Sequence, residues 1–391
     1  MISFLRSPQT ILYTGFFLYI LQFAFTHFAH SSFMIDGCAC GITENDVGLI
    51  FTTSALIALV LLSEMPLLAE RYSNRTVLIV LVALTSLSLL GILAAPHPYI
   101  LVGSLVTYIS LHAPVILGFD IFFKEHTPLH KTGSVRGTMI ALIYTAVLIG
   151  LLVMGPILET SYSFWGLYGI GFIINMIALG ILVFNKGVFT LIHAPAKISF
   201  FASLSHVLKN TALRRIVVLN FLLHVFFILS FIYLPVYLHQ HQNMDWSMIG
   251  ILFALVMLPF IILSKPLGDF LDTSGRNKEI LMAGFIMMAL GVFATGLIVS
   301  SSWILWLGIL MLGRIGATCV RVVTESYFFD HVDKKDEGLM SVFRDIDPLA
   351  TILIPFMATL LLAYTGASVS VVFIASALIL LTGVFLSSKV D

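Results

Sequence analysis

Runs of about 20 mostly apolar residues recur along the whole chain, and they constrain the fold more than any other feature. A helix of about 20 such residues crosses the hydrocarbon core of a bilayer, where only helices and closed barrels satisfy their backbone polar groups. With 59% hydrophobic and 10% charged residues, a water-soluble fold would expose too much apolar surface. The runs are too long for the alternating strands of a barrel. We therefore expect an all-α integral membrane protein.

Twelve of these runs are predicted to span the membrane. The first is too long for the core of a signal peptide and lacks a small-residue cleavage site, so we expect it to stay in the protein. The predicted spans are residues 11–34, 47–69, 76–95, 98–123, 136–158, 163–185, 213–238, 247–270, 279–299, 302–329, 337–363 and 367–387.

Lys and Arg are distributed unequally between the two sides of these spans. The loops after the odd-numbered spans contain neither, whereas the even-numbered loops and both chain ends are basic. Positively charged loops stay on the cytoplasmic side, so both termini are predicted to be cytoplasmic, with the protein in the cell (inner or plasma) membrane. The longest connection, the basic loop 186–212, separates an N-terminal bundle (1–185) from a C-terminal bundle (213–391).

The two halves of the sequence align with weak identity but nearly constant spacing. The matching segments are VGLIF (47–51) with IGILF (249–253), PLLAERYSNR (66–75) with GDFLDTSGRN (268–277), FFKEH (122–126) with FFDHV (328–332), and RGTM (136–139) with EGLM (337–340). Their offsets stay between 201 and 206 residues. Parallel six-span repeats are a known transporter architecture, in which the binding site lies between the repeats near the midplane.

The second copy of the repeated loop, GDFLDTSGRNK (268–278), resembles the signature motif of the major facilitator superfamily (MFS) between its eighth and ninth spans. The matching residues are Gly268, Asp272, Gly275 and Arg276. In the first-half copy the fitting residues are Leu68, Ala69, Glu70, Arg71 and Arg75, whereas Pro66 and Ser73 replace the glycines. The resemblance covers the whole chain and implies the MFS fold, with twelve transmembrane helices in two pseudo-symmetric six-helix bundles.

The resemblance also implies that these loops latch the cytoplasmic side when the protein faces outward. Asp120 and Glu325 lie at nearly equivalent inner ends of spans 4 and 10, and we expect Asp120 to pair with Arg71 or Arg75. Glu325 is expected to pair with the arginine of the second-half motif or with Arg321, four residues away on one helix face. The expected cytoplasmic gate comprises Glu70, Arg71, Arg75, Asp120, Gly268, Asp272, Gly275, Arg276, Arg321, Glu325 and Arg344.

In the superfamily, helices 1, 4, 7 and 10 line a central cavity, so the resemblance implies that their midspan polar residues meet the substrate. These residues are Gln22, Thr26, His27, His30, Tyr108, His112, Asn220, His224 and Arg314. Helices 3, 6, 9 and 12 are implied to face lipid, and Asn175 in span 6 has no expected role. Each histidine either packs through a hydrogen bond or titrates and binds substrate. No metal site is expected.

Arg314 lies about 12 residues into span 10, roughly 18 Å along the helix, which is close to the bilayer centre. A charge there needs water, an acid or a substrate as a partner. Two interpretations stay open, namely a structural ion pair with an acid such as Asp347, and the binding of an anionic group.

The stretch FRDIDPL (343–349) places Arg344, Asp345 and Asp347 near the start of span 11, where charges are rare and usually functional. Pro348 removes a backbone donor and disfavours helical geometry at Asp347. A carboxylate there could carry a coupling proton, and Asp347 is the first candidate, with Asp345 the second. The alternative is a gate of salt bridges without proton transfer.

Gly155-Pro156 in span 5 resembles part of the glycine–proline motif of superfamily antiporters that export drugs, although the fuller glycine repeat is missing. The favoured function is therefore a secondary active transporter that exports a small organic solute by alternating access and is coupled to protons, like a drug/proton antiporter. The alternatives are an importer or exchanger of organic anions that uses Arg314, and a lipid or lysolipid flippase.

Other classes of protein lack their motifs in this sequence. No G-x-x-x-x-G-K-[ST], G-x-S-x-G or H-E-x-x-H occurs, so we expect neither a nucleotide-driven pump nor an enzyme, and no cofactor. A receptor on a transporter fold would show no solute flux. A formal net charge of zero gives no indication of nucleic acid. Cys38, Cys40 and Cys319 are expected to be unpaired, because a bridge across one residue is strained. We expect a monomer in the lipid bilayer, with a small organic substrate and protons as partners.

Overall fold

The computed structural model describes residues 8–38, 40–94, 97–126, 132–189, 209–300, 302–331, 346–366 and 368–390. Within these ranges the regular structure is helical and contains no strand. Twelve helices in this part of the chain are long and apolar enough to cross a membrane, judged by length and composition. The predicted all-α membrane class is confirmed.

The chain divides into two compact units. Unit 1 is Met1–Thr43 with Ile50–Lys197, and unit 2 is Glu44–Leu49 with Ile198–Asp391. The helices that begin in the first half are α1 (Pro8–His27), α2 (His30–Ser32), η2 (Phe33–Gly37), α3 (Glu44–Tyr72), α4 (Asn74–Ala94), α5 (Pro98–Glu125), α6 (Thr132–Leu158) and α7 (Ser163–Phe184). The first turns of α3 thus belong to unit 2, and the rest of these helices form unit 1.

The second half contains more interruptions. Its helices are α9 (Thr211–Ile228), η4 (Leu229–Tyr233), α10 (Leu234–Val236), η5 (Tyr237–His241), α11 (Trp246–Val256), α12 (Leu258–Ile262), α13 (Ser264–Ser274), α14 (Asn277–Leu297), α15 (Trp303–His331), α17 (Ile346–Thr365) and α18 (Ser370–Ser387). The predicted spans 7 and 8 are each built from several of these segments. Prolines at 235 and 259 open α10 and α12, where a missing backbone N–H is tolerated.

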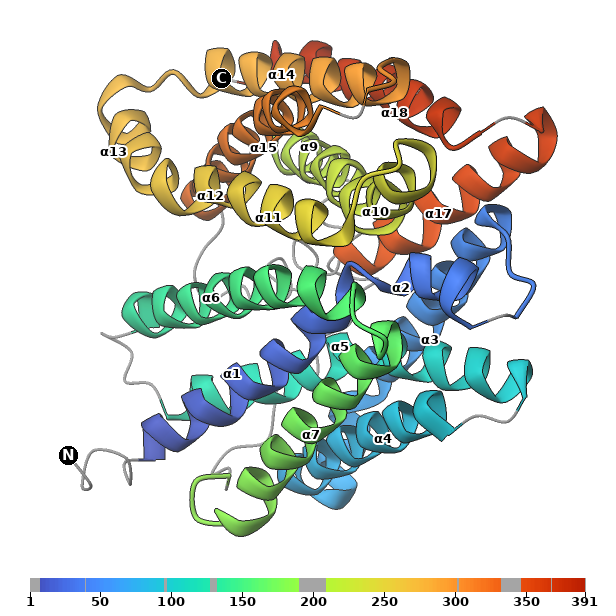
Figure 1. Cartoon of the computed structure of the whole chain (residues 1–391). Helices are drawn as coiled ribbons and strands as arrows, with labels where there is room; N and C mark the ends of the chain where they lie inside the picture. Colours follow the sequence, from blue (N-terminus) through green and yellow to red (C-terminus); the bar gives the residue numbers. More distant parts are fainter. Residues whose placement is uncertain are drawn as a thin grey trace. The chain divides into compact units, whose positions relative to one another are not determined.

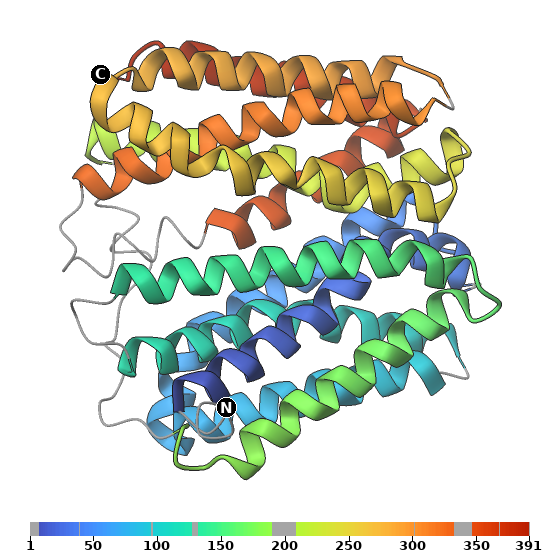
Figure 2. The ribbon, with the colours of Figure 1, turned by 60° about the vertical axis from the view of Figure 1, so that its left-hand side comes forward.

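The two units repeat one pattern of helix packing (Figure 1; Figure 2). In unit 1, α1 packs on α6 and α7, and α4 packs on α5 and α7. In unit 2, α9 packs on α17 and α18, and α14 packs on α15 and α18. Each helix of unit 2 therefore takes the place of its counterpart in the first half, as the sequence offsets predict. In unit 1 the core is formed by large apolar side chains such as Phe16, Leu78 and Phe119.

The two repeated loops share a left-handed backbone turn. Gly275 ends α13 with φ of +63°, and Ser73, between α3 and α4, has φ of +73°. The two positions are 202 residues apart. Glycine adopts this left-handed conformation freely, whereas a residue with a Cβ pays about 1–2 kcal/mol. Ser73 offsets part of this cost, because its hydroxyl accepts the backbone N–H of Thr76 at 3.4 Å and so caps α4.

Asn175, the polar residue of span 6 without an expected role, joins α7 to α4. Its Nδ2 donates to the Ser86 hydroxyl at 2.8 Å and to the Val82 carbonyl at 3.1 Å. The Asn175 side chain is fully buried. Hydrogen bonds between helices of this kind hold membrane bundles together, so Asn175 is a structural contact within unit 1.

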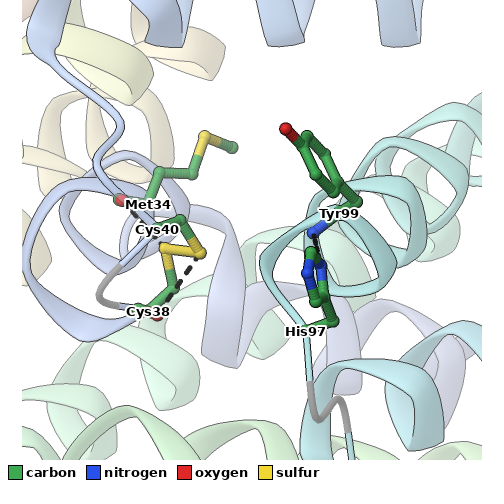
Figure 3. The surroundings of a disulfide bond; sticks show 5 residues. All are labelled: Met34, Cys38, Cys40, His97 and Tyr99. Carbon is green, nitrogen blue, oxygen red and sulfur yellow. Dashed lines mark hydrogen bonds between the residues drawn. A yellow bond between two sulfur atoms is a disulfide. The ribbon is translucent and has the colours of Figure 1, made fainter.

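The cysteines differ in part from expectation. Cys38 and Cys40 form a disulfide just after η2 (Figure 3), so the expectation of free thiols is wrong for this pair. Their Cα atoms are 5.2 Å apart, a separation that a disulfide can bridge even with one residue between. Cys319 is a free thiol in α15, as expected.

Candidate functional site

A group of uncharged, hydrogen-bonded side chains is buried between α1 and α5 of unit 1. The Tyr108 hydroxyl donates to Oε1 of Gln22 at 3.0 Å, and it lies 2.9 Å from the hydroxyl of Thr26. Gln22 and Thr26 are 0% exposed. Residues four apart on a helix lie on one face, so α1 presents both side chains to the same tyrosine of α5.

His30 and Tyr168 extend this group to α7. Nδ1 of His30 lies 2.8 Å from the Tyr168 hydroxyl, and the His30 ring centroid is 5.4 Å from that of Tyr108. His30 and Tyr168 are both fully buried. The helix break after α1 places His30 at the start of α2.

Flat rings lie beside these polar groups. Phe23 of α1 stacks on His112 of α5, with ring centroids 3.4 Å apart and planes 7° from parallel. Tyr19 stacks on the same imidazole at 5.9 Å and 13°, and His27 packs beside Phe23 at 4.7 Å. From these two groups we select seven residues and call them the polar–aromatic cluster: Gln22, Phe23, Thr26, His30, Tyr108, His112 and Tyr168. Tyr19 and His27 lie at its edge.

The polar–aromatic cluster has unused hydrogen-bonding capacity and contains no acidic residue, lysine or arginine. Nε2 of Gln22 and Nε2 of His30 are buried without a hydrogen-bond partner. An unpaired buried donor or acceptor costs about 1–3 kcal/mol, so native proteins seldom keep one without a reason. Among the buried polar side chains described in unit 1 there is no Asp, Glu, Lys or Arg. The arrangement suits contacts with a neutral, polar ligand.

In unit 2, α9 carries His224 close to α17. Nε2 of His224 lies 3.7 Å from Oδ1 of Asp347, and Nδ1 lies 2.8 Å from the carbonyl oxygen of Asn220. A carbonyl only accepts, so Nδ1 carries the proton and Nε2 of the neutral ring presents a lone pair. Two acceptors therefore face each other, and one added proton converts their contact into an attraction. The Asp347 side chain is 64% exposed and that of His224 is 18% exposed, so water also reaches this contact.

Arg314 of α15 contacts α9 and α12 through aromatic rings. It is 4% exposed, and its Cζ lies 5.4, 5.8 and 5.6 Å from the ring centroids of Phe226, Phe227 and Phe260. Rings at these distances attract a guanidinium through their negative faces. Its two predicted roles, as the partner of an acid and as an anion ligand, stay predictions.

Two of the predicted gate arginines have well-defined partners. Nε of Arg321 donates to Oε1 of Glu325 at 2.8 Å, so the contact expected between residues four apart on α15 is present. Arg75 donates to the carbonyls of Leu182 and Val183 at 3.2 and 2.8 Å. It therefore binds the last turn of α7, where the helix dipole favours a cation.

The other predicted gate residues lie near helix ends. Glu70 and Arg71 are in the last turn of α3, Asp120 lies towards the end of α5, and Arg276 directly precedes α14. Gly268 is in the middle of α13. The predictions that fall outside the described residues or side chains are Asp272, Arg344 and Asp345.

At the other end of unit 2, the first turn of α3 is tied to α17 and η5. Nε2 of His241 lies 2.6 Å from Oε1 of Glu44, and the Thr359 hydroxyl donates to the Asn45 carbonyl at 2.9 Å. His241 is thus engaged with a carboxylate. In the part of the chain that the structure describes, no group of three or more His, Cys, Asp or Glu is placed to hold a metal ion.

The sequence patterns do not single out Phe23 or Tyr168. Tyr168 lies in a helix that was expected to face lipid, yet its ring is fully buried against His30. A usable signal existed, since Tyr168 lies seven residues before Asn175 and so shares a helix face with it. The contact between His224 and Asp347 joins two residues that were selected separately.

Comparisons with known proteins agree with this architecture. The family model described as Major Facilitator Superfamily matches residues 9–264 and 232–389. The nucleoside transporter NupG has a similar structure, with TM-score 0.76, 12% identity, and coverage of 98% of this chain and 100% of that one. A mutant of NupG gives a TM-score of 0.77 at 11% identity, with the same coverage. The POT family transporter PepTSo gives 0.76 at 12% identity, covering 98% of this chain and 97% of that one. At such low sequence identities, the structural likeness shows a shared fold and nothing more. A search of curated protein sequences gave no match.

Proposed function

The chain belongs to the major facilitator superfamily, and from this premise we propose that it is a proton-coupled secondary active transporter of a small organic solute. In the proposed cycle, the bundles 1–185 and 213–391, connected by the loop 186–212, move to open one side of the membrane at a time. Members of such a family move small solutes across a membrane, and the proton coupling is the part that needs support from this chain's own residues.

The contact between His224 and Asp347 carries the proposal of proton coupling. Because Asn220 places the proton of the neutral imidazole on Nδ1, Nε2 and the carboxylate 3.7 Å away form a contact that can take up one further proton. Asp345, the second candidate, lies outside the described residues, and so does Arg344.

A proton held by this pair changes the charge of unit 2, and a charge change is what biases a conformational equilibrium. We propose that protonation of the pair and binding of the solute each shift the equilibrium between the conformations open to the two sides of the membrane.

We also propose that the charged loops at the inner helix ends form the cytoplasmic gate. The proposed gate residues are the Arg321–Glu325 pair, the arginines at 71, 75, 276 and 344, the acids at 70, 120 and 272, and the loop glycines at 268 and 275.

The proposed direction of transport rests on a weaker feature, the Gly155-Pro156 pair. Pro156 lies inside α6 after Gly155, and the likeness of this pair to the motif of drug-exporting antiporters supports export with proton antiport. A second candidate, exchange of an organic anion, is favoured by the buried Arg314. In either case we propose a monomer in the cell membrane with both termini in the cytoplasm.

Proton coupling is tested in liposomes that contain only this protein and enclose a pH-sensitive dye. A panel of uridine, benzoate and tetraphenylphosphonium supplies a neutral solute, an anion and a lipophilic cation. The wild type is expected to move protons with at least one of them. His224→Gln and Asp347→Asn each remove one titrating group with little change in shape. Each is expected to lower proton-driven transport by about tenfold or more, equivalent to about 1.4 kcal/mol, while counterflow of the same solute persists.

Matched controls separate coupling from a general loss of charge. Glu279→Gln and His97→Gln remove the same types of titrating group from exposed positions, and both are expected to transport normally. Proton movement that stays unchanged in Asp347→Asn contradicts the assignment. Loss of counterflow together with proton coupling points to a structural role for the pair.

A further inference from the structure

We propose that the polar–aromatic cluster of unit 1 binds the transported solute and selects an uncharged planar ring that carries an amide or lactam group. This inference rests on the proposed function, because it names the class of solute that the transporter carries. It assigns solute-binding roles to Phe23 and Tyr168 as well as to Gln22 and His30.

The first part of the argument is the amide of Gln22. Its oxygen accepts the Tyr108 hydroxyl at 3.0 Å, and the side chain is fully buried. Its Nε2 has no hydrogen-bond partner. Because that nitrogen only donates, the group it lacks is an acceptor, such as a carbonyl oxygen on a ligand.

The second part is the imidazole of His30. Its Nδ1 is engaged with the Tyr168 hydroxyl at 2.8 Å, and its Nε2 is buried and unpartnered. If the Tyr168 hydroxyl donates, Nε2 of His30 carries the proton and donates to the ligand; in the other tautomer Nε2 accepts. A ligand amide satisfies both cases, since it offers an N–H and a carbonyl side by side.

The third part is the set of flat rings next to these two nitrogens. Phe23, His112 and Tyr19 form a column of nearly parallel rings, and the His30 ring stacks on Tyr168 at 5.9 Å and 27°. A planar ligand ring packs on such faces by offset stacking, whereas a bulky saturated one makes poorer contact. The cluster therefore favours a flat solute.

The fourth part is the lack of charge. The buried polar side chains described in unit 1 include no Asp, Glu, Lys or Arg, so beside the neutral imidazoles of His30 and His112 an ionic solute would lose its hydration without gaining a counter-charge. The two unpartnered nitrogens are covered in this conformation. The solute must therefore enter through another conformation of the transport cycle.

Three pairs of ligands differ only in charge and test the proposal directly. They are nicotinamide with nicotinate, benzamide with benzoate, and uracil with orotate. Binding to the purified full-length protein is measured by equilibrium dialysis, with thermal stabilisation as a second readout, because a ligand that binds only the folded state raises its stability. We expect the neutral member of at least one pair to bind about tenfold or more tightly than its anionic partner.

Substitutions then locate the site. Gln22→Met and His30→Phe keep much of the side-chain volume and remove the unpartnered nitrogens, and each is expected to weaken binding of the neutral ligand about tenfold or more. Ser88→Ala is the matched control, since it removes a buried hydroxyl that bonds only within its own helix; it should bind normally. If Gln22→Met does not fold, Gln22→Asn is the substitute, because it keeps the amide group but moves it back by one methylene; it should also weaken binding of the neutral ligand.

The outcomes distinguish this inference from the proposed function. Preference for the anionic members, no binding by any neutral member at about 10 mM, or normal binding by both cluster variants overturns the inference. Proton-coupled flux of benzoate or tetraphenylphosphonium, without binding of any neutral member, would leave the transport function standing while excluding this solute class. Absence of any coupled flux together with tight binding of a neutral amide would refute the coupling alone.

Discussion

The two units carry different kinds of polar group on similar arrangements of helices. In unit 1, Gln22 and Tyr108 belong to an uncharged cluster between α1 and α5. In unit 2, the counterpart helices α9 and α15 carry His224, which lies 3.7 Å from Asp347, and the buried Arg314. The packing of the helices is repeated between the units, so the difference lies in the side chains.

This comparison shows how a repeated fold can separate two tasks. In our proposal, the cluster of unit 1 recognises the solute through hydrogen bonds and ring contacts. The His224–Asp347 pair of unit 2 takes up the coupling proton and needs no contact with the solute's polar groups. We infer that unit 1 is specialised for recognition and unit 2 for coupling, and the predictions that follow exchange or remove the features that distinguish them.

The largest effect is expected when charge is introduced into the uncharged cluster of unit 1. Gln22→Glu replaces an amide that is 0% exposed with a carboxylic acid of nearly the same shape. A buried, unpaired carboxylate costs several kcal/mol, of the order of 3–5 kcal/mol, and we expect a correspondingly lower melting temperature. The loss should grow between about pH 5 and about pH 8, because the introduced carboxyl group is ionised in the unfolded chain above its ordinary pKa of about 4.3, whereas the buried acid keeps its proton in the folded protein. Thermal unfolding in detergent measures it, with Gln22→Met as the uncharged control. Equal stability of Gln22→Glu and wild type at the higher pH would contradict a charge-free site.

An intermediate effect is expected when the buried charge of unit 2 is removed. Arg314→Gln loses the guanidinium that lies 5.4 to 5.8 Å from three phenylalanine rings, and transport should fall about tenfold or more, about 1.4 kcal/mol. Arg314→Lys keeps the charge but loses the planar group that stacks on the rings, so it should rescue little.

Solute binding separates the possible reasons for that loss. Under the proposed division, dialysis should show that Arg314→Gln binds the neutral amide normally. If transport is intact in Arg314→Gln, the residue has no role in coupling; if neutral-ligand binding is lost, recognition is not confined to unit 1.

The smallest effect concerns the equivalent turns, where the two halves differ by one side chain. Gly275→Ser places a Cβ at φ of +63°, in open space, and is expected to cost about 1 kcal/mol. The reciprocal change, Ser73→Gly, should gain only about 0.5 kcal/mol, because it also removes the cap that accepts the Thr76 N–H. Chemical denaturation of both variants measures the pair. Destabilisation by Ser73→Gly of 1 kcal/mol or more would show that the cap outweighs the backbone strain.

Much of the fold could be predicted from the sequence because its causes are local. The length and hydropathy of each run determine whether it can span a membrane, and the offset of 202 residues predicts the repeated packing. The left-handed turn at Ser73 follows from the same alignment with Gly275, although serine itself gives little indication of it.

The partners of polar side chains were harder to predict, because they depend on which helices meet and how they are rotated. Arg75 was expected to pair with an acid, and its described hydrogen bonds go to the end of α7. No role for Asn175 is predicted from the sequence, because its partners on α4 lie some ninety residues away in sequence. The contact of Tyr168 with His30 is hard to predict for a similar reason, since it depends on the meeting of α7 with α2.

The most direct test of the division of tasks compares two variants in one assay. Counterflow and proton-driven transport of the same neutral solute are measured in liposomes containing Gln22→Met or Asp347→Asn. We predict that Gln22→Met loses both activities by a similar factor, whereas Asp347→Asn loses proton-driven transport and keeps counterflow. Loss of both activities in Asp347→Asn, or full retention of both in Gln22→Met, would contradict the separation of recognition in unit 1 from coupling in unit 2.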